Sequence, residues 1–114
     1  MKEQSRRHFQ VGEAIKRELA RMFLEGRFSG ICPGRVSINE VRPSRGYEHA
    51  TVFVRAFCGK DTSDAVRALN DHAATIRYEL AQSMSMRSTP ELRFKADESE
   101  DEAARIEELL KQDA

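Results

Sequence analysis

Apolar side chains recur at helical spacing in the first part of the chain. The apolar positions are Val11, Ile15, Leu19, Met22 and Phe23. Intervals of four, four, three and one residue place them on one face of an α-helix. Gly26 follows as a suitable residue to end this helix, because glycine readily adopts the left-handed conformation found at helix C-termini.

An alternating pattern predicts two strands after this helix. Residues 26–34 hold three glycines and a proline, which predicts a loop. Apolar and polar residues then alternate at the start of 36–41 and again over 50–57, with a turn at 43–46 between them. Two strands joined by a short turn are expected to pair as an antiparallel hairpin.

A second helical pattern follows the hairpin. Its apolar positions are Val66, Leu69, Ala73, Ile76, Leu80 and Met84. Asp61, Thr62 or Ser63 can cap its start. Leu92 and Phe94 alternate with polar residues within 87–95, which predicts a third strand with Pro90 near its start or on an edge. The helical connection is long enough to bring this strand back as a crossover from the second one.

The order of predicted elements is helix, strand, strand, long helix or helix pair, strand, and a last helix around residues 103–110. This order indicates an α+β protein with a three-stranded sheet packed against helices, and it fits neither an all-α bundle nor a β-barrel. A chain of 114 residues has the length of one domain.

Charge divides the chain unequally although the 19 basic and 19 acidic residues cancel. Residues 1–95 carry 17 basic and 11 acidic residues, whereas residues 96–114 carry 2 and 8. We therefore expect a basic domain over 1–95 that meets a polyanion, and an acidic tail over 96–114.

Arginine supplies most of the positive charge, which suits bidentate contacts to phosphate. If the first helix extends back to Arg6, then Arg6, Arg17 and Arg21 lie together on the side opposite its apolar face, with Glu13 among them. An ordinary solvated helix face would show the same pattern.

Several classes of chemistry find no support in the sequence. No phosphate-binding glycine motif, nucleophile elbow or clustered set of metal ligands is present. We expect no catalytic residues, cofactor, metal or small-molecule substrate. No apolar run approaches the length of a membrane span, and the charged start is unlike a secretory signal, so we expect a cytoplasmic protein with Cys32 and Cys58 as reduced thiols.

Four segments carry a resemblance to a known family. They are RRHFQVGEAIKREL (6–19), VSINEVRPSRGYEHATVFVRAF (36–57), ALNDHAATIRYELAQSM (68–84) and RSTPELRF (87–94). Ser44 with the segment 49–52, and the segment 89–94, are the most specific pieces. From residue 5 to about residue 112 the chain resembles ribosome-binding factor A. The resemblance implies a K-homology-like domain of the second type that binds the immature 30S subunit and its 16S rRNA and assists rRNA processing.

The resemblance also implies a kink within the long helix. The family has a small residue, any residue and then glycine where this chain has His72, Ala73 and Ala74. Alanine at the last position favours unbroken helix over glycine by about 0.8–1 kcal/mol, and the apolar face continues through Ala73, which permits a straight helix. We favour a bend, because a helix of about 22 residues would extend about 33 Å and overhang a small sheet.

The hairpin turn differs from the family as well, because an acidic residue often stands where this chain has Gly46. Arg45 beside it makes the implied binding surface more basic. The residues expected to contact RNA are Arg6, Arg7, Arg17 and Arg21 in the first helix, Ser44 and Arg45 in the turn, and Ala73, Ala74, Arg77 and Arg87 around the bend and the third strand.

Two functions of different classes follow. The first is a monomeric, non-catalytic RNA-binding factor that grips phosphates of the small ribosomal subunit. The second is a protein-interaction adaptor without direct RNA contact, in which the hairpin edge or the acidic tail recruits a partner. A small enzyme would need a concave site with convergent polar groups.

Overall fold

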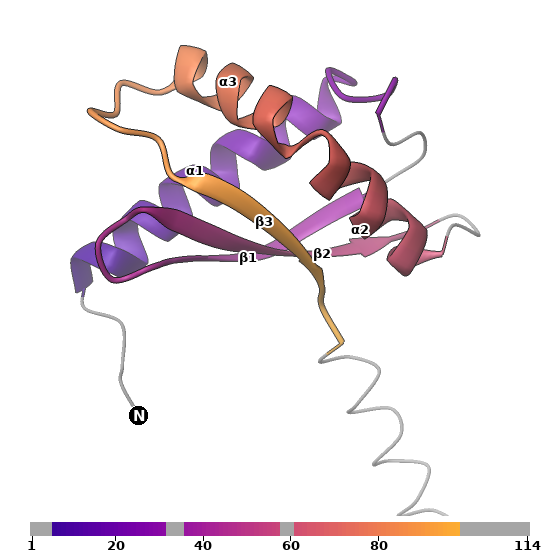
Figure 1. Cartoon of the computed structure of the whole chain (residues 1–114), viewed down its shortest axis with the longest axis horizontal. Helices are drawn as coiled ribbons and strands as arrows, with labels where there is room; N and C mark the ends of the chain where they lie inside the picture. Colours follow the sequence, from indigo (N-terminus) through magenta and orange to yellow (C-terminus); the bar gives the residue numbers. More distant parts are fainter. Residues whose placement is uncertain (1–5, 32–35, 58–60, 99–114) are drawn as a thin grey trace, which may run out of the picture.

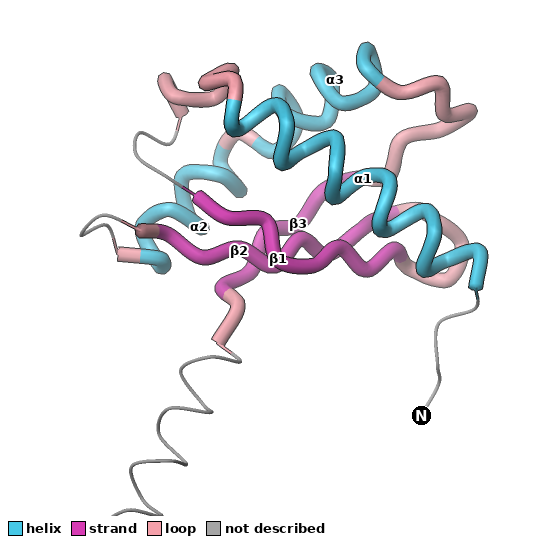
Figure 2. Tube along the Cα trace, turned by 180° about the vertical axis from the view of Figure 1, so that it is seen from behind, coloured by secondary structure: helices cyan, strands magenta, loops and turns pink. Residues whose placement is uncertain are grey.

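Three helices cover one face of a three-stranded sheet and leave the other face open (Figures 1 and 2). The computed structural model describes residues 6–31, 36–57 and 61–98. The elements are α1 (Arg6–Leu24), β1 (Val36–Pro43), β2 (His49–Ala56), α2 (Thr62–Asp71), α3 (Ala73–Ser83) and β3 (Glu91–Ala96). The predicted α+β order is confirmed for these elements. The helix expected around 103–110 lies outside the described residues.

The sheet has the order β1-β2-β3 and mixes both kinds of pairing. β1 and β2 form the predicted antiparallel hairpin, with a shift in register between Ile38 and Glu40. β2 and β3 are parallel, with His49 opposite Glu91. The helical connection therefore returns the chain along β2, as a crossover requires.

The core lies between the covered face of the sheet and the helices. The most deeply buried core side chains are Ile15, Leu19, Met22, Leu69, Ile76, Leu80, Val52 and Val54. Burial alternates along β2 and β3, as expected for strands with one covered face. The apolar faces predicted for both helical segments are thus the faces that pack on the sheet.

Two capping residues set the helix ends as predicted. Gly26 has φ of 80°. Its N–H donates to the Phe23 carbonyl at 3.0 Å, and the Arg27 N–H donates to that of Met22 at 3.1 Å. This pair of bonds is a Schellman motif, which satisfies the last carbonyls of α1. At the start of α2 the Asp61 carboxylate accepts a bond from the Ser63 N–H at 2.9 Å.

The long helical segment breaks at His72, so the favoured bend is confirmed although no glycine is present. His72 has φ of −117° and ψ of 23°, outside the helical region. Its N–H donates to the Leu69 carbonyl at 3.2 Å. Its Nδ1 atom lies 3.1 Å from the Ala68 carbonyl oxygen. In an unbroken helix the His72 backbone N–H would donate to that carbonyl, so a proton on Nδ1 replaces the lost backbone donor.

Asn70, in the last turn of α2, fastens the helix to the outer edge of β3. Its Nδ2 atom donates to the Phe94 carbonyl at 2.9 Å, and its Oδ1 atom accepts from the Phe94 N–H at 2.8 Å. Phe94 lies on an edge strand, where backbone groups otherwise lack a ladder partner. The side-chain amide thus occupies both polar backbone groups at the middle of this edge.

Gly12 allows α1 to lie close against β1. A Cβ atom at this position would overlap the Val41 carbonyl oxygen and stand 3.2 Å from Cδ of Pro43. Glycine costs about 1 kcal/mol in a helix interior relative to alanine. The close approach therefore explains a glycine in the middle of α1.

We expect Gly12→Ala to destabilise the domain. The added Cβ atom would overlap backbone, which cannot rotate aside, so the overpacking cost should lie in the upper half of the usual range, about 2–3 kcal/mol. Alanine returns about 0.8–1 kcal/mol of helix propensity, so the net loss should be roughly 1–2 kcal/mol. Urea denaturation measures the free energy of unfolding. Gly30→Ala is the control, because a Cβ atom there meets nothing within 4 Å. A Gly12→Ala protein as stable as the parent would contradict the close approach.

Candidate nucleic-acid interface

The start of α1 is fixed against the β1–β2 turn by two aromatic rings. The imidazole of His8 stacks on the phenol of Tyr47 with 4.5 Å between ring centroids. Nε2 of His8 lies 2.9 Å from the backbone oxygen of Arg45. These contacts bring the arginines at the beginning of α1 and the arginine of the turn to the same end of the domain (Figure 1).

Ser44 shapes the turn through its hydroxyl and its backbone. Its Oγ atom accepts bonds from the backbone N–H groups of Glu48 at 3.1 Å and His49 at 3.2 Å. The Ser44 N–H donates to the His49 carbonyl at 2.7 Å, and Tyr47 adopts φ of 62°. Ser44 therefore holds the conformation that presents Arg45, which gives this predicted site residue a positioning role in the structure.

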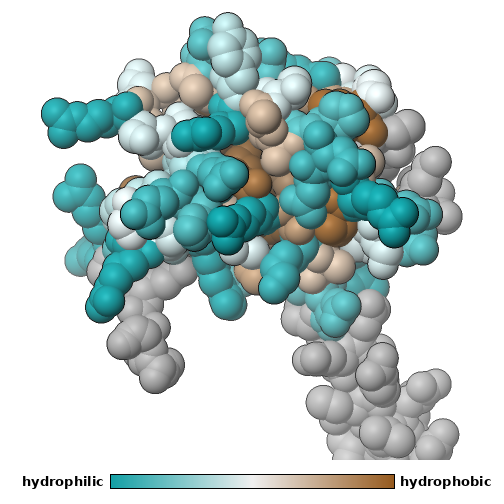
Figure 3. All heavy atoms as spheres, viewed as in Figure 1, coloured by the Kyte–Doolittle hydropathy of each residue, from teal (hydrophilic) through white to brown (hydrophobic). Residues whose placement is uncertain are grey.

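Three arginines at this end have no acidic partner in the part of the chain that the structure describes. Arg6, Arg7 and Arg45 are exposed, and none of them forms an ion pair within the described residues. An unpaired guanidinium keeps its full hydrogen-bonding capacity for a phosphate. Hydrophilic side chains project at this end of the molecule in Figure 3, on the left of the view.

Arg77 and Arg87 meet in an open hollow between α3 and the loop before β3. The hollow has a volume of about 510 Å³. Its lining residues are Ala74, Arg77, Tyr78, Ala81, Met86, Arg87, Ser88 and Thr89. It therefore unites three of the four residues expected around the bend and third strand. The fourth, Ala73, is half-buried and packs against the core instead.

Both arginine groups lie toward the same end of the sheet. β3 begins beside the end of the hairpin turn, because the Glu91 N–H donates to the Glu48 carbonyl at 2.9 Å. The loop that carries Arg87 leads into this strand. The turn, the start of α1 and the loop before β3 are neighbours in Figure 1.

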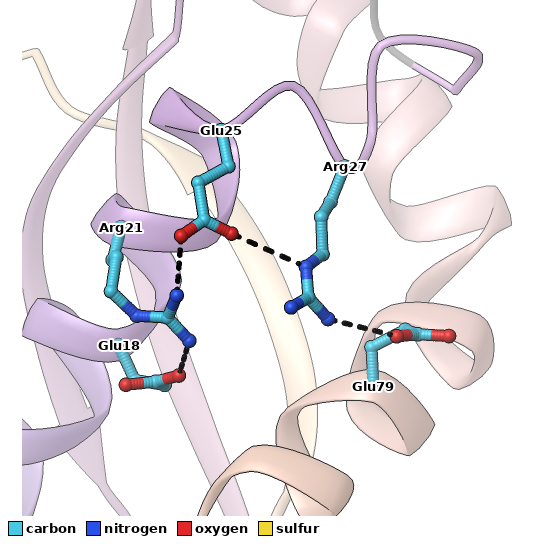
Figure 4. Close-up of polar contacts among 5 residues, drawn as sticks. All are labelled: Glu18, Arg21, Glu25, Arg27 and Glu79. Atoms are coloured by element: carbon cyan, nitrogen blue, oxygen red, sulfur yellow. Dashed lines mark hydrogen bonds and ion pairs between the residues drawn. The ribbon is translucent and has the colours of Figure 1, made fainter.

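Arg21 differs from the other predicted arginines because it is held by carboxylates (Figure 4). It forms ion pairs with Glu18 and, at 2.5 Å, with Glu25. Arg27 continues the network to Glu25 at 3.5 Å and to Glu79 of α3 at 3.3 Å. This network joins the end of α1 to α3.

The charges of this network shift each other's proton affinity. The hydrogen bond from Arg21 lowers the pKa of the Glu18 carboxyl below its ordinary value, against the opposing effect of burial. The same bond raises the pKa of Arg21.

Arg17, one turn earlier, is exposed and has no ion pair among the described residues. The predicted arginine stripe therefore divides into an unpaired part and a paired part.

Tyr78 is the residue that the sequence analysis missed. It is 62% exposed and lines the hollow beside Arg77. The signal was present in the sequence, since Tyr78 falls outside the apolar face that Ile76 and Leu80 define. An aromatic ring off the buried face of a helix, next to an arginine, indicates a surface role.

Arginines on the open face of the sheet are paired. Arg42 contacts Glu40 at 2.7 Å and lies 5.2 Å from the centre of the Phe53 ring. Arg93 lies 3.8 Å from Glu91. Arg42 and Arg93 on this face are thus paired, whereas Arg6, Arg7 and Arg45 near the turn and Arg87 at the hollow form no ion pair among the described residues. Arg17 on α1 and Arg67 on α2 are also exposed without an ion pair in this part of the chain.

The described part of the chain contains no group of His, Cys, Asp or Glu side chains able to hold a metal ion. No helix within it has the length and apolar character needed to cross a membrane. Cys32 and Cys58 lie outside the described residues, so their reduced state stays a prediction.

A protein-family model for ribosome-binding factor A matches residues 7–110, which is most of the chain. The chain belongs to the ribosome-binding factor A family. A ribosome-binding factor A from Phenylobacterium zucineum is 38% identical over 108 residues, which are 93% of this chain and 74% of that protein.

A crystal structure and a homology model of ribosome-binding factor A from Thermus thermophilus share the fold. The crystal structure has a TM-score of 0.66 at 25% identity and covers 78% of this chain and 94% of its own. The other was fitted into a cryo-electron microscopy map of a complex with the 30S subunit. It has a TM-score of 0.61 at 25% identity and covers 76% of this chain and 91% of its own. The K-homology-like fold of the ribosome-binding factor A family is therefore confirmed.

Arg17 and Arg21 are expected to respond differently to charge reversal. Arg21→Glu places a third carboxylate beside Glu18 and Glu25, so like charges replace two ion pairs and the thermal unfolding midpoint should fall by a few degrees. Arg17→Glu breaks no pair in the described structure and should leave the midpoint unchanged. Circular dichroism melting curves of the two proteins measure this. Equal midpoints would mean that the ion-pair network contributes nothing to stability.

Proposed function

We propose that this protein is an RNA-binding factor that binds the 30S ribosomal subunit through its 16S rRNA and assists maturation and rRNA processing without catalysis. Residues 1–95 form the RNA-binding domain and residues 96–114 the acidic tail. The protein acts as a monomer in the cytoplasm and uses no cofactor.

The observation that carries this proposal is the group of unpaired arginines at one end of the domain. Arg6, Arg7 and Arg45 share this end because His8 ties α1 to the turn. Arginine contacts to phosphates release counterions, which favours binding at low salt and provides affinity without base recognition. The resemblance to a relative whose homology model was fitted into the map of a 30S complex supports the same partner.

The mechanism is steric and electrostatic. Guanidinium groups bind the sugar-phosphate backbone, and the rigid sheet-and-helix domain then holds an rRNA segment in one conformation until the segment matures. In this mechanism binding free energy alone does the work, by favouring one conformation of the rRNA segment over others.

Replacement of the three unpaired arginines tests the proposal. We expect Arg6→Ala, Arg7→Ala and Arg45→Ala together to weaken cosedimentation with precursor small subunits. The slope of log affinity against log salt concentration should become shallower by about one for each phosphate that the protein no longer neutralises. A salt series of sedimentation assays measures both.

A charge-matched variant controls for net charge. Arg27→Ala, Arg42→Ala and Arg93→Ala together remove three arginines that are ion-paired in the structure. This triple variant should keep most of the affinity and the salt slope. Two results would refute binding through Arg6, Arg7 and Arg45. One is a parent protein whose affinity for small subunits does not change across the salt series. The other is an equal loss of affinity in the two triple variants.

The adaptor function makes an opposite prediction about the tail. Strand addition at β3 is disfavoured because Asn70 occupies the Phe94 backbone groups.

Removal of residues 99–114 takes away six carboxylates and two basic side chains. An RNA-binding factor should then bind small subunits as well as before or more tightly, because repulsion from phosphate is removed. An adaptor that uses the tail should lose its partner, and its binding should survive nuclease treatment.

A further inference from the structure

The hollow beside α3 has the charge of a phosphate site. Arg77 and Arg87 are among its lining residues, and no lining residue is acidic. Arg87 is exposed and has no ion pair within the described part of the chain. Elsewhere Arg21, Arg27 and Arg42 each contact a carboxylate, so a hollow with two arginines and no acid is distinctive.

Arg77 is held in position without losing its charge. Its Nε atom donates to the Thr89 carbonyl at 2.9 Å, and Thr89 is itself buried. This bond orients the guanidinium toward the loop and leaves the two Nη groups without a partner among the described residues. A fork of donors fixed in this way suits the oxygens of a phosphate.

Tyr78 provides a flat surface in the same hollow. Its side chain is 62% exposed. The two lining residues of the hollow that lie one turn before and after it on α3 are Ala74 and Ala81, which are too short to cover the ring. Base stacking on an exposed aromatic ring contributes about 1–3 kcal/mol for each base.

We propose that this hollow binds one unpaired nucleotide of single-stranded RNA, with the base stacked on Tyr78 and the adjoining phosphate bound by Arg77 and Arg87. A volume of about 510 Å³ is within the range of small-molecule sites. A base within a duplex has both ring faces covered by its neighbours, so the site selects unstacked RNA. The assignment rests on the proposed function and names the form of RNA that this part of the surface recognises.

Base stacking on Tyr78 is tested by measuring the affinity for a fluorescently labelled oligouridine by fluorescence anisotropy. Tyr78→Ala should weaken binding by roughly 5- to 150-fold, the equivalent of one stacked base. Tyr78→Phe keeps the ring and should bind like the parent protein. Phe57→Ala is the matched control, because Phe57 is another exposed aromatic, 45% exposed, that lies outside the hollow.

Each alternative gives a distinct result. Base stacking would be overturned by either of two results. In the first, Tyr78→Ala binds oligouridine as tightly as the parent protein does. In the second, Tyr78→Phe loses as much affinity as Tyr78→Ala. A labelled RNA hairpin without unpaired bases should bind more weakly than oligouridine, and equal affinity would overturn the preference for unstacked RNA. An acidic peptide that displaces oligouridine from the parent and from Tyr78→Ala at equal concentrations would assign the hollow to a protein partner.

The same proteins separate this inference from the broader proposal. If Tyr78→Ala loses oligouridine affinity and the parent binds small subunits in a salt-dependent way, both stand. If oligouridine binding does not depend on Tyr78 and small-subunit binding still depends on Arg6, Arg7 and Arg45, only the inference fails. If neither form of RNA binding depends on these residues, the proposed function fails with it.

Discussion

The close contact between α1 and β1 at Gly12 fixes how the start of α1 lies against the hairpin turn. With no side chain at this position, the helix rests directly on the Val41 carbonyl and on Pro43. Its first turn then reaches the hairpin turn, where His8 meets Tyr47 and the Arg45 carbonyl. A packing requirement in the core thus sets the position of charged groups on the surface.

Ion pairing distinguishes two kinds of arginine on this domain. Arg21 and Arg27 are paired with Glu18, Glu25 and Glu79, and the pair between Arg27 and Glu79 joins the end of α1 to α3. Arg6, Arg7 and Arg45 at the hairpin end form no ion pair among the described residues. Net charge alone does not reveal this division, because both kinds contribute equally to the sum. Ion pairs on a protein surface contribute little stability. The two kinds of arginine therefore differ mainly in whether the guanidinium is available to bind a ligand.

Much of the fold was predictable because periodicity reports which face of an element is buried. The apolar residues of α1, the hairpin and the parallel third strand all followed from spacing and turn residues. The interface was less predictable, since partners distant in sequence decide which arginines are unpaired. Glu79 lies 52 residues from Arg27, and no local pattern links them. The stacking of His8 on Tyr47 and the exposure of Tyr78 depend likewise on how the elements pack.

Asn70 has a consequence for how copies of this domain coexist in solution. A parallel edge strand with free N–H and carbonyl groups is a template on which another extended chain can assemble. The amide of Asn70 terminates that template at Phe94 by imitating the backbone of an additional strand. The sheet is therefore closed to growth at the middle of this edge, and crowded molecules have less opportunity to join through it into fibres.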